Sequence, residues 1–384
     1  MEWKEVRLGD ILNFRRGHDL PHSAMKPGNI PVAGSNGVIG YHDTATPIKP
    51  ILTIGRSGNV GKPYFYEEAW AHNTTLYVDD FKGNDPKFLY YLCQTMPFAN
   101  FGGGSAVPTL NRNHIHPLET KIPVKVEDQC RIASILSSLD RKIELNNKIN
   151  ADLEEMAQAI FKNWFVDFEP FKDGKFVDSE LGMIPEGWKV VTLDDLTSKF
   201  GTGLNPRKNF VLGHGNNYYV TIKNMGNNRI YLNDRCDKVD DEALAKINKR
   251  SKLQKGDLLF SGIGTIGRVA MIVDDPINWN TSESVFNMHP IDTVSSEFIY
   301  LLLLSDKFQQ YVQQNAQGGV QQGIRMASLK AFQFAIPDDL NLFDNLVKPI
   351  ISKVKSNDKE NDALSLLRDT LLPRLMSGEL EVPE

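Results

Sequence analysis

Two long stretches of the chain each have a series of mainly apolar residues that recur at every seventh position. On a helix, such a series forms a stripe along one side. The first stretch has Ile132, Leu139, Asn146, Leu153 and Ile160 on its stripe, and the second has Phe343, Ile350, Asn357, Leu364 and Leu371. Residues three positions further on extend the stripes to a second seam, at Ile135, Ile149, Met156, Leu346 and Leu367. Such a stripe has to be buried against another helix, so both stretches are predicted to be long helices.

Each stripe contains one asparagine, at the same place in both stretches. The stretches align at a constant offset of 211 residues, which brings Asn146 onto Asn357. A polar residue in a helix interface lowers stability but fixes the register. We therefore expect the helices to pair with each other, the alternative being that each packs only on its own globular domain. Pro349 predicts that the second helix is kinked or begins there.

The segments that precede the two helices are also repeats of each other. Residues 3–11 (WKEVRLGDI) match residues 188–196 (WKVVTLDDL), and Phe88-Leu89-Tyr90 matches Phe298-Ile299-Tyr300. The matches keep their order along the chain, and their offset rises by about 21 residues between Asp195 and Gly264. An ordered series of this kind indicates an internal duplication, with an insertion early in the second copy.

These patterns predict an α+β chain with two similar globular α/β domains and two long helices. The chain ends Val-Pro-Glu and begins Met-Glu-Trp-Lys, as if its end ran into its beginning, because the second copy opens with Ile-Pro-Glu-Gly-Trp-Lys. We therefore expect a circular, pseudo-two-fold arrangement in which the helices form an antiparallel coiled coil. The expected parts are domains at 1–124 and 187–337, a central helix at 125–165, a linker at 166–186, and a C-terminal helix and tail at 338–384.

Charge is distributed unevenly between these parts, although the net charge is only −5. Residues 1–124 carry 12 Lys and Arg against 11 Asp and Glu, and residues 187–337 carry 17 against 14. Residues 125–186 and 338–384 are acidic, with 8 against 13 and 6 against 10. Mildly basic domains suit DNA binding only if a partner supplies much of the phosphate affinity. The alternative is solvated charge with no ligand.

Cysteine usage and the start of the chain indicate a cytoplasmic protein. The three cysteines, Cys93, Cys130 and Cys236, are widely spaced and predict neither a disulfide framework nor a zinc cluster. The opening residues are charged and are followed by no apolar secretion signal. No metal site is expected, because His114 and His116 have no partner at ligand spacing.

The repeated Trp-Lys opening, the Leu110-Asn111-Arg112 segment and the entry into the first helix resemble one family. With residues 161–168 (FKNWFVDF) and 182–188 (GMIPEGW), they are similar to the specificity subunit of type I restriction–modification enzymes. The resemblance covers essentially the whole chain. The second copy departs from it, since Ile324-Arg325-Met326 replaces the Leu-Asn-Arg segment.

The resemblance implies two target-recognition domains that each read one half of a split double-stranded DNA site, with the helices fixing the gap. It also implies two methyltransferase subunits, and in the restriction form two ATP-dependent translocase–nuclease subunits. S-adenosylmethionine, ATP and Mg²⁺ would then belong to the partners, and methylation would fall on adenine N6. This chain itself would hold no cofactor, no metal and no catalytic residue.

Candidate DNA-binding residues are the polar loop side chains that offer donors to base edges or phosphates. In the first domain these are Arg15, Arg16, His18, Asn36, Arg56, Ser57, Asn59, Asn111 and Arg112. In the second they are Arg207, Lys208, Lys223, Asn224, Arg250, Arg268, Gln321, Gln322 and Arg325. The aromatic run Phe161, Trp164, Phe165 and Phe168 is expected in a core, with a methyltransferase contact as the alternative.

Two enzymatic interpretations are weaker. Residues 260–264 (FSGIG) spell a loop of the type that binds S-adenosylmethionine, but a base-flipping methyltransferase also needs a Pro-Pro motif, and the chain has none. Residues 55–62 suggest a phosphate loop, yet the spacing is one residue too long and Pro63 stands where Ser or Thr would bind magnesium. The remaining alternative is a scaffold in which paired helices hold two protein-binding domains.

Overall fold

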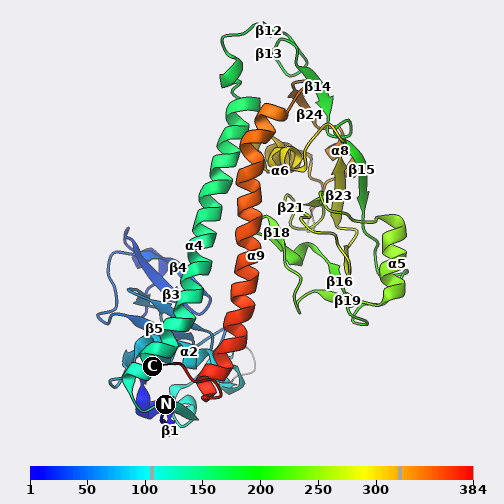
Figure 1. Cartoon of the computed structure of the whole chain (residues 1–384). Coiled ribbons are helices and arrows are strands. Elements are labelled where there is room, and N and C mark those ends of the chain that lie inside the picture. The colour runs from blue at the N-terminus through cyan, green and yellow to red at the C-terminus, as the bar shows by residue number, and fades with distance from the viewer. Residues whose placement is uncertain (104–107, 319–321, 384) are drawn as a thin grey trace. The chain divides into compact units, whose positions relative to one another are not determined.

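The computed structural model describes residues 1–103, 108–318 and 322–383 (Figure 1). The chain is α+β and divides into two compact units, each with helices and sheets. The first unit consists of Met1–Asn146 with Lys359–Glu384, and the second is the continuous segment Asn147–Asp358. The chain therefore leaves and re-enters the first unit in the middle of its two long helices, α4 (Val126–Phe165) and α9 (Asn341–Ser377).

The two long helices pair with each other, and they run antiparallel (Figure 1). In the first unit, Asn146 Nδ2 donates to Asn361 Oδ1 at 3.0 Å, and Arg368 contacts Asp140 at 2.8 Å. Residue numbers thus rise along α4 while they fall along α9. In the second unit, Asn357 Nδ2 donates to Asn150 Oδ1 at 2.8 Å. The predicted pairing is confirmed, but Asn146 and Asn357 each bind an asparagine that the pattern had not singled out. The second helix begins at Asn341, before Pro349.

The residues of the seven-residue stripe are buried or half-buried in both helices. Ile132, Asn146, Asn357 and Phe343 are buried. The other predicted positions are half-buried: Leu139, Leu153, Ile160, Ile350, Leu364 and Leu371.

The predicted second seam is wrong at Met156, Leu346 and Leu367, whereas Ile135 and Ile149 are half-buried. The interface is completed four residues after the stripe, at the buried residues Leu136, Asn150, Ala157, Val347, Val354 and Asn361. Met156, Leu346 and Leu367, three residues after it, are 52%, 48% and 47% exposed. A seven-residue repeat alternates steps of three and four, so a stripe can be completed on either side. Apolar residues occur on both sides here, and the sequence alone favoured the wrong one.

The globular part of the first unit contains a four-stranded antiparallel sheet and a smaller three-stranded one. The larger sheet has the order β2 (Asn13–Arg16), β8 (Thr75–Asp80), β5 (Ile51–Gly55) and β6 (Pro63–Tyr66). The smaller has β4 (Gly37–His42), β3 (Ile30–Gly34) and β7 (Trp70–Ala71), with β3 and β7 parallel. β1 (Trp3–Arg7) pairs with β11 (Glu119–Pro123) just before α4.

The second unit repeats this connectivity strand for strand. Its larger sheet is β15 (Thr197–Thr202), β23 (Val285–Pro290), β20 (Leu258–Ser261) and β21 (Val269–Met271). Its smaller sheet is β19 (Asp237–Val239), β16 (Asn217–Val220) and β22 (Trp279–Thr281), and β14 (Lys189–Thr192) pairs with β24 (Gln333–Ile336). The predicted duplication is confirmed.

The predicted insertion in the second copy is also visible. In the first unit a two-residue turn, Ser35-Asn36, joins β3 to β4. In the second unit the matching strands β16 and β19 are separated by a hairpin made of β17 (Met225–Gly226) and β18 (Arg229–Ile230). Helix α5 (Asp241–Arg250) then precedes β20.

Each unit buries its own core, to which both long helices contribute. In the first unit, α2 (Pro86–Thr95) places Phe88, Leu89 and Leu92 against Ile132 of α4 and Leu375 of α9. In the second, α6 (Ser296–Leu304) packs against the aromatic run of α4. Phe161 and Phe165 of this run are 1% and 2% exposed, which confirms that they belong to a core.

Candidate nucleic-acid interface

The candidate residues of the first domain gather where β2 meets β8, around a close approach of two backbones. Gly17 N donates to Thr75 O at 3.0 Å. A Cβ added at Gly17 would lie 2.1 Å from His72 O, so only glycine fits there. This contact brings Arg15, Arg16 and His18 next to the segment that contains Asn73.

Acidic and amide side chains hold these arginines. Arg15 NH1 lies 3.3 Å from Asp79 Oδ2, and the Arg15 side chain remains 61% exposed. Arg16 pairs with Asp19 at 3.5 Å, and Asp19 also accepts a hydrogen bond from Asn73. Arg56 donates to Asn73 O at 3.3 Å. Arg16 of β2 and Arg56, directly after β5, are thus linked through Asp19 and Asn73, with their guanidinium groups restrained.

Three further loops join this edge of the first domain. Leu110 N donates to Arg56 O at 2.7 Å, and Ser57 forms a β-bridge with Thr109. Asn111 begins helix α3 (Arg112–Ile115), accepting from Asn113 N at 3.0 Å, and Arg112 donates to Phe14 O at 3.2 Å. The turn that contains Asn36 borders the loop of Ser57 and Asn59, since Ser35 O lies near Gly55. The exposed ring of His18 lies 5.5 Å from Trp70 and 5.6 Å from Tyr77.

His116 ties this edge to the core in its neutral form. Its Nε2 accepts a hydrogen bond from Phe14 N at 3.1 Å, which requires an unprotonated nitrogen. Burial lowers the pKa of His116, and the nearby Arg112 and Lys82 lower it further.

We expect the stability of the first unit to fall as the pH drops from 7 through the lowered pKa of His116. The unfolded chain then binds a proton that the folded one resists. His116→Gln keeps an acceptor but cannot titrate, so its thermal midpoint should depend less on pH between 7 and 5. Equal pH dependence in both proteins would remove His116 from this account.

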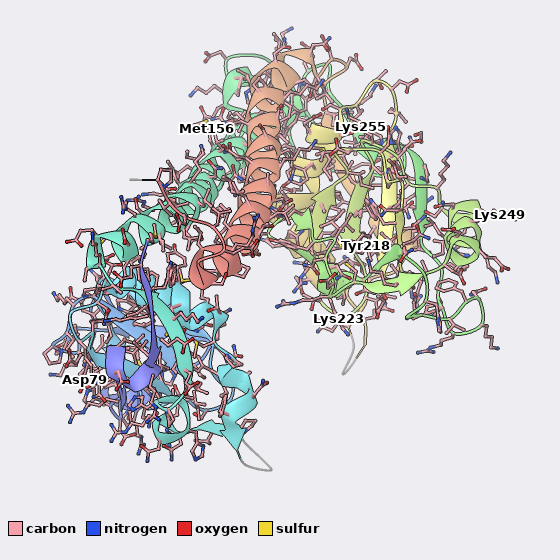
Figure 2. All side chains as sticks on the ribbon, turned by 60° about the horizontal axis from the view of Figure 1, so that its bottom comes forward. Asp79, Met156, Tyr218, Lys223, Lys249 and Lys255 are labelled. Carbon is pink, nitrogen blue, oxygen red and sulfur yellow. The ribbon has the colours of Figure 1, made fainter. Side chains whose placement is uncertain are left out.

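The second domain has the same close approach at the matching place. A Cβ at Gly203 would lie 1.6 Å from Thr281 O. Next to it, Asn205 donates to Glu283 Oε1 at 2.6 Å and accepts from Arg207 N at 3.0 Å. Arg207 and Lys208 are exposed on this turn. Arg250 donates to Thr202 Oγ1 at 3.4 Å, from the end of α5, where Lys249 projects outward in Figure 2.

Two loops of the second domain meet as Arg56 and Leu110 do in the first. Gly264 N donates to Gln322 O at 2.7 Å, and Ile324 N donates to Gly262 O at 2.9 Å. Arg325 is exposed at the start of α8 (Met326–Lys330). Gln321 lies outside the described residues.

Two candidates of the second domain have structural partners instead of free side chains. Asn224 is 4% exposed, and its Oδ1 accepts from Thr221 N and Oγ1 at 3.0 and 3.1 Å. Arg268 donates to Ile222 O and Met225 O at 2.8 and 2.5 Å. Lys223, which directly precedes Asn224 in the sequence, is exposed (Figure 2).

Comparison with known proteins identifies this duplicated frame. The family model described as "Type I restriction modification DNA specificity domain" matches residues 1–155 and again residues 185–342. The chain belongs to the type I restriction–modification DNA specificity family. Among the described residues of this family member, no three His, Cys, Asp or Glu side chains are grouped to hold a metal ion. None of its described helices is long and apolar enough to cross a membrane.

Specificity subunits from two organisms are similar over most of the chain. The MjaIX specificity subunit of Methanocaldococcus jannaschii is 29% identical over 78% of this chain and 70% of its own length. The HindI specificity subunit of Haemophilus influenzae is 27% identical over 98% and 94%. The crystal structure of the type I restriction–modification S subunit from M. genitalium has the same fold, with a TM-score of 0.62 at 15% identity and 98% and 96% coverage. The family is a non-catalytic DNA-recognition component of type I systems, and DNA recognition is the role of this specificity subunit.

Sequence reasoning missed the side chains that position the donors of this specificity subunit. Asp19, Asp79 and Glu283 are acidic, and an acidic side chain is not itself expected to bind DNA. The only signal was local: Asp19 lies three residues after Arg16 and Asn205 two residues before Arg207. Asp79 and Glu283 meet their partners through strand pairing or a turn contact far apart in sequence, so no local pattern could reveal them.

Proposed function

We propose that this specificity subunit reads a two-part DNA sequence, one part with each recognition domain. The observation that carries the proposal is the repetition of one loop cluster. In each domain, exposed cationic side chains lie near a glycine that follows the first strand of the larger sheet. This glycine is Gly17 after β2 in the first domain and Gly203 after β15 in the second. Arginine and asparagine can read base edges by paired hydrogen bonds, and lysine can bind phosphates. We assign recognition to residues 1–124 and 187–337, and the linker to residues 166–186.

We propose further that the long helices set the gap between the two half-sites. α4 has 40 residues, so it is about 60 Å long. Its pairing with α9 is fixed by the two asparagine pairs, since a slipped register would leave buried amides without partners. Half-sites about one helical turn apart would let both domains bind one face of the DNA.

Two methyltransferase subunits are the proposed partners. The support is an apolar surface that the duplication provides twice. Met156 and Leu367 match at the offset of 211 residues, as do Ile135 and Leu346, and three of the four are about half exposed. Lys142 and Glu360 also lie three positions after a residue of the seven-residue stripe, in the same rows as these apolar residues. Their side chains pair at 3.4 Å, so in the first unit the rows of α4 and α9 run along one side of the helix pair. A surface present twice fits two copies of one partner.

The remaining partner assignments follow from this proposal. Two restriction subunits would join the complex in a restricting system, and S-adenosylmethionine, ATP and Mg²⁺ would bind the partner subunits. Such a complex would work on DNA in the cytoplasm.

Methylation mapping tests the proposed function. Plasmid DNA is incubated with S-adenosylmethionine and the methyltransferase subunit, with and without this chain, and N6-methyladenine is then located by sequencing. We expect methylation at one split motif, only when this chain is present. If the complex forms but no split motif is methylated, the scaffold alternative becomes the better account.

A further inference from the structure

A hairpin of the second domain contacts both long helices through one residue at its tip. Asn227 and Asn228 connect β17 to β18 with left-handed backbones, at φ 46° and 54°. The Asn228 Nδ2 donates to Glu154 Oε2 of α4 at 3.1 Å. The Asn228 carbonyl oxygen accepts from Lys355 Nζ of α9, also at 3.1 Å. The hairpin tip is therefore bound to the two helices where they pair.

The next residue connects the hairpin to the polar layer of the helix interface. Arg229 NH1 lies 3.4 Å from Asp358 Oδ1, and their side chains are only 16% and 18% exposed. Asp358 also accepts from Asn150 Nδ2 at 3.1 Å, and Asn150 accepts from Asn357. The contacts that hold the hairpin are thus continuous with those that fix the helix register.

Burial makes these contacts sensitive to the loss of any partner. Lys355 is 8% exposed, and its ammonium group lies 4.9 Å from the centre of the Tyr300 ring. Tyr300 OH donates to Glu154 Oε1 at 3.5 Å. Burial raises the pKa of Glu154 and lowers that of Lys355, as expected for charges removed from water. A buried charge that loses its partner is strongly destabilising.

The other end of the hairpin is held by Arg268, one of the predicted DNA-binding residues. Arg268 donates to the carbonyl oxygens of Ile222 and Met225, which flank the start of β17. The exposed Lys223 lies between Ile222 and Met225 in the sequence. The hairpin therefore connects the segment that contains Lys223 to the helix pair.

The first unit has no counterpart of this device among its described residues. A two-residue turn replaces the hairpin. At the offset of 211 residues, Glu154, Lys355 and Asp358 correspond to Ser365, Glu144 and Asn147. The duplication preserved the helix pairing, but the charges that bind the hairpin are specific to the second unit.

We propose that the β17–β18 hairpin sets the angle at which the second recognition domain stands on the helix pair, and so restricts the spacer lengths that the enzyme accepts. Asn228 and Arg229 are then positioning residues for the second half-site. This inference rests on the proposed reading of a split site.

The test uses the complete methyltransferase complex and plasmids whose spacer differs from the natural one by one or two base pairs. Asn228→Gly removes the amide but keeps a residue that tolerates φ 54°. Arg229→Met removes the ion pair at similar side-chain length. Asn227→Gly is the matched control, since Asn227 has the same kind of backbone and its amide donates only to Tyr231 OH within the second domain, at 3.3 Å.

We expect the preference for the natural spacer over its neighbours to fall roughly tenfold or more in Asn228→Gly/Arg229→Met, because the loss of one hydrogen bond with a charged group already corresponds to about that factor. Asn227→Gly should keep the wild-type preference. An unchanged preference in a folded double variant would overturn the proposal, as would equal loss at every spacer length. If the double variant does not fold, Asn228→Gly alone decides by the same ratio. Failure of wild-type enzyme to methylate any split motif would instead overturn the proposed function.

Discussion

Inserting one heptad into each long helix will lengthen the gap between the half-sites by about three base pairs and leave the half-sites unchanged. Seven residues add about 10 Å of helix, and B-DNA rises about 3.4 Å per base pair. The seven residues are inserted directly after Lys148 in α4 and directly after Lys359 in α9. Both asparagine pairs then stay intact within their own units. Methylation mapping on random-spacer DNA measures the new gap.

Helical phase gives this experiment a second arm. Three base pairs turn the second half-site roughly 100° around the DNA axis, since a full turn takes about 10.5 base pairs, so the one-heptad variant should methylate more slowly than the wild type. Three heptads in each helix add about nine base pairs and nearly restore the phase, so their rate should recover. The same insert after the exposed Gly174, in the linker, should leave the gap unchanged. A one-heptad variant that keeps the original gap would end the idea that the helices set it.

Phe165→Ala will destabilise the second unit by about 3–5 kcal/mol, the usual range for an aromatic residue removed from a core. Phe165 is 2% exposed, and its ring lies 4.8 Å from Phe343 and 5.1 Å from Phe298. These partners come from α9 and α6, so one truncation weakens three elements. The thermal midpoint of this unit should fall by about 6–20 °C, as measured by calorimetry or circular dichroism.

The neighbouring residue provides the control for this prediction. Val166 is 41% exposed, so Val166→Ala should change the stability by less than about 0.5 kcal/mol. A Phe165→Ala protein with normal stability that fails to bind the methyltransferase would assign the aromatic run to the partner surface. Loss of stability with partner binding retained at low temperature would assign it to the core.

The fold was largely predictable because most of its elements occur in two copies along the sequence. The strand pattern of either copy is weak alone, but ordered matches such as Phe88-Leu89-Tyr90 with Phe298-Ile299-Tyr300 indicate one architecture used twice. Helix pairing could be predicted because an apolar stripe has to be buried and because both stripes have an asparagine at the same place. The face that completes the stripe could not, since Leu136 and Ile135 are equally apolar and only the partner helix distinguishes them.

The candidate site was less predictable because its contacts join distant parts of the chain. Arg16 and Arg56 were found as polar loop residues, but their link through Asn73 depends on the pairing of β2 with β8. Asn224 is of a residue type that can read bases, yet its side-chain oxygen accepts a hydrogen bond from Thr221 N in the turn that leads into the hairpin. A side chain's type indicates what it can bind, and only the fold indicates whether it is free to do so.

The division of the chain has a consequence for its synthesis. The second unit is one continuous segment, whereas the core of the first unit needs Leu372, Leu375 and Met376, near the end of the chain. At about 5–20 residues per second, the ribosome reaches Leu372 roughly 10–45 s after Asn146. The N-terminal domain, although made first, therefore waits with apolar surface uncovered while the later unit folds. If synthesis stalls before the second half of α9, that surface will stay exposed to proteases and chaperones. This holds even though residues 1–124 have all been synthesised by then.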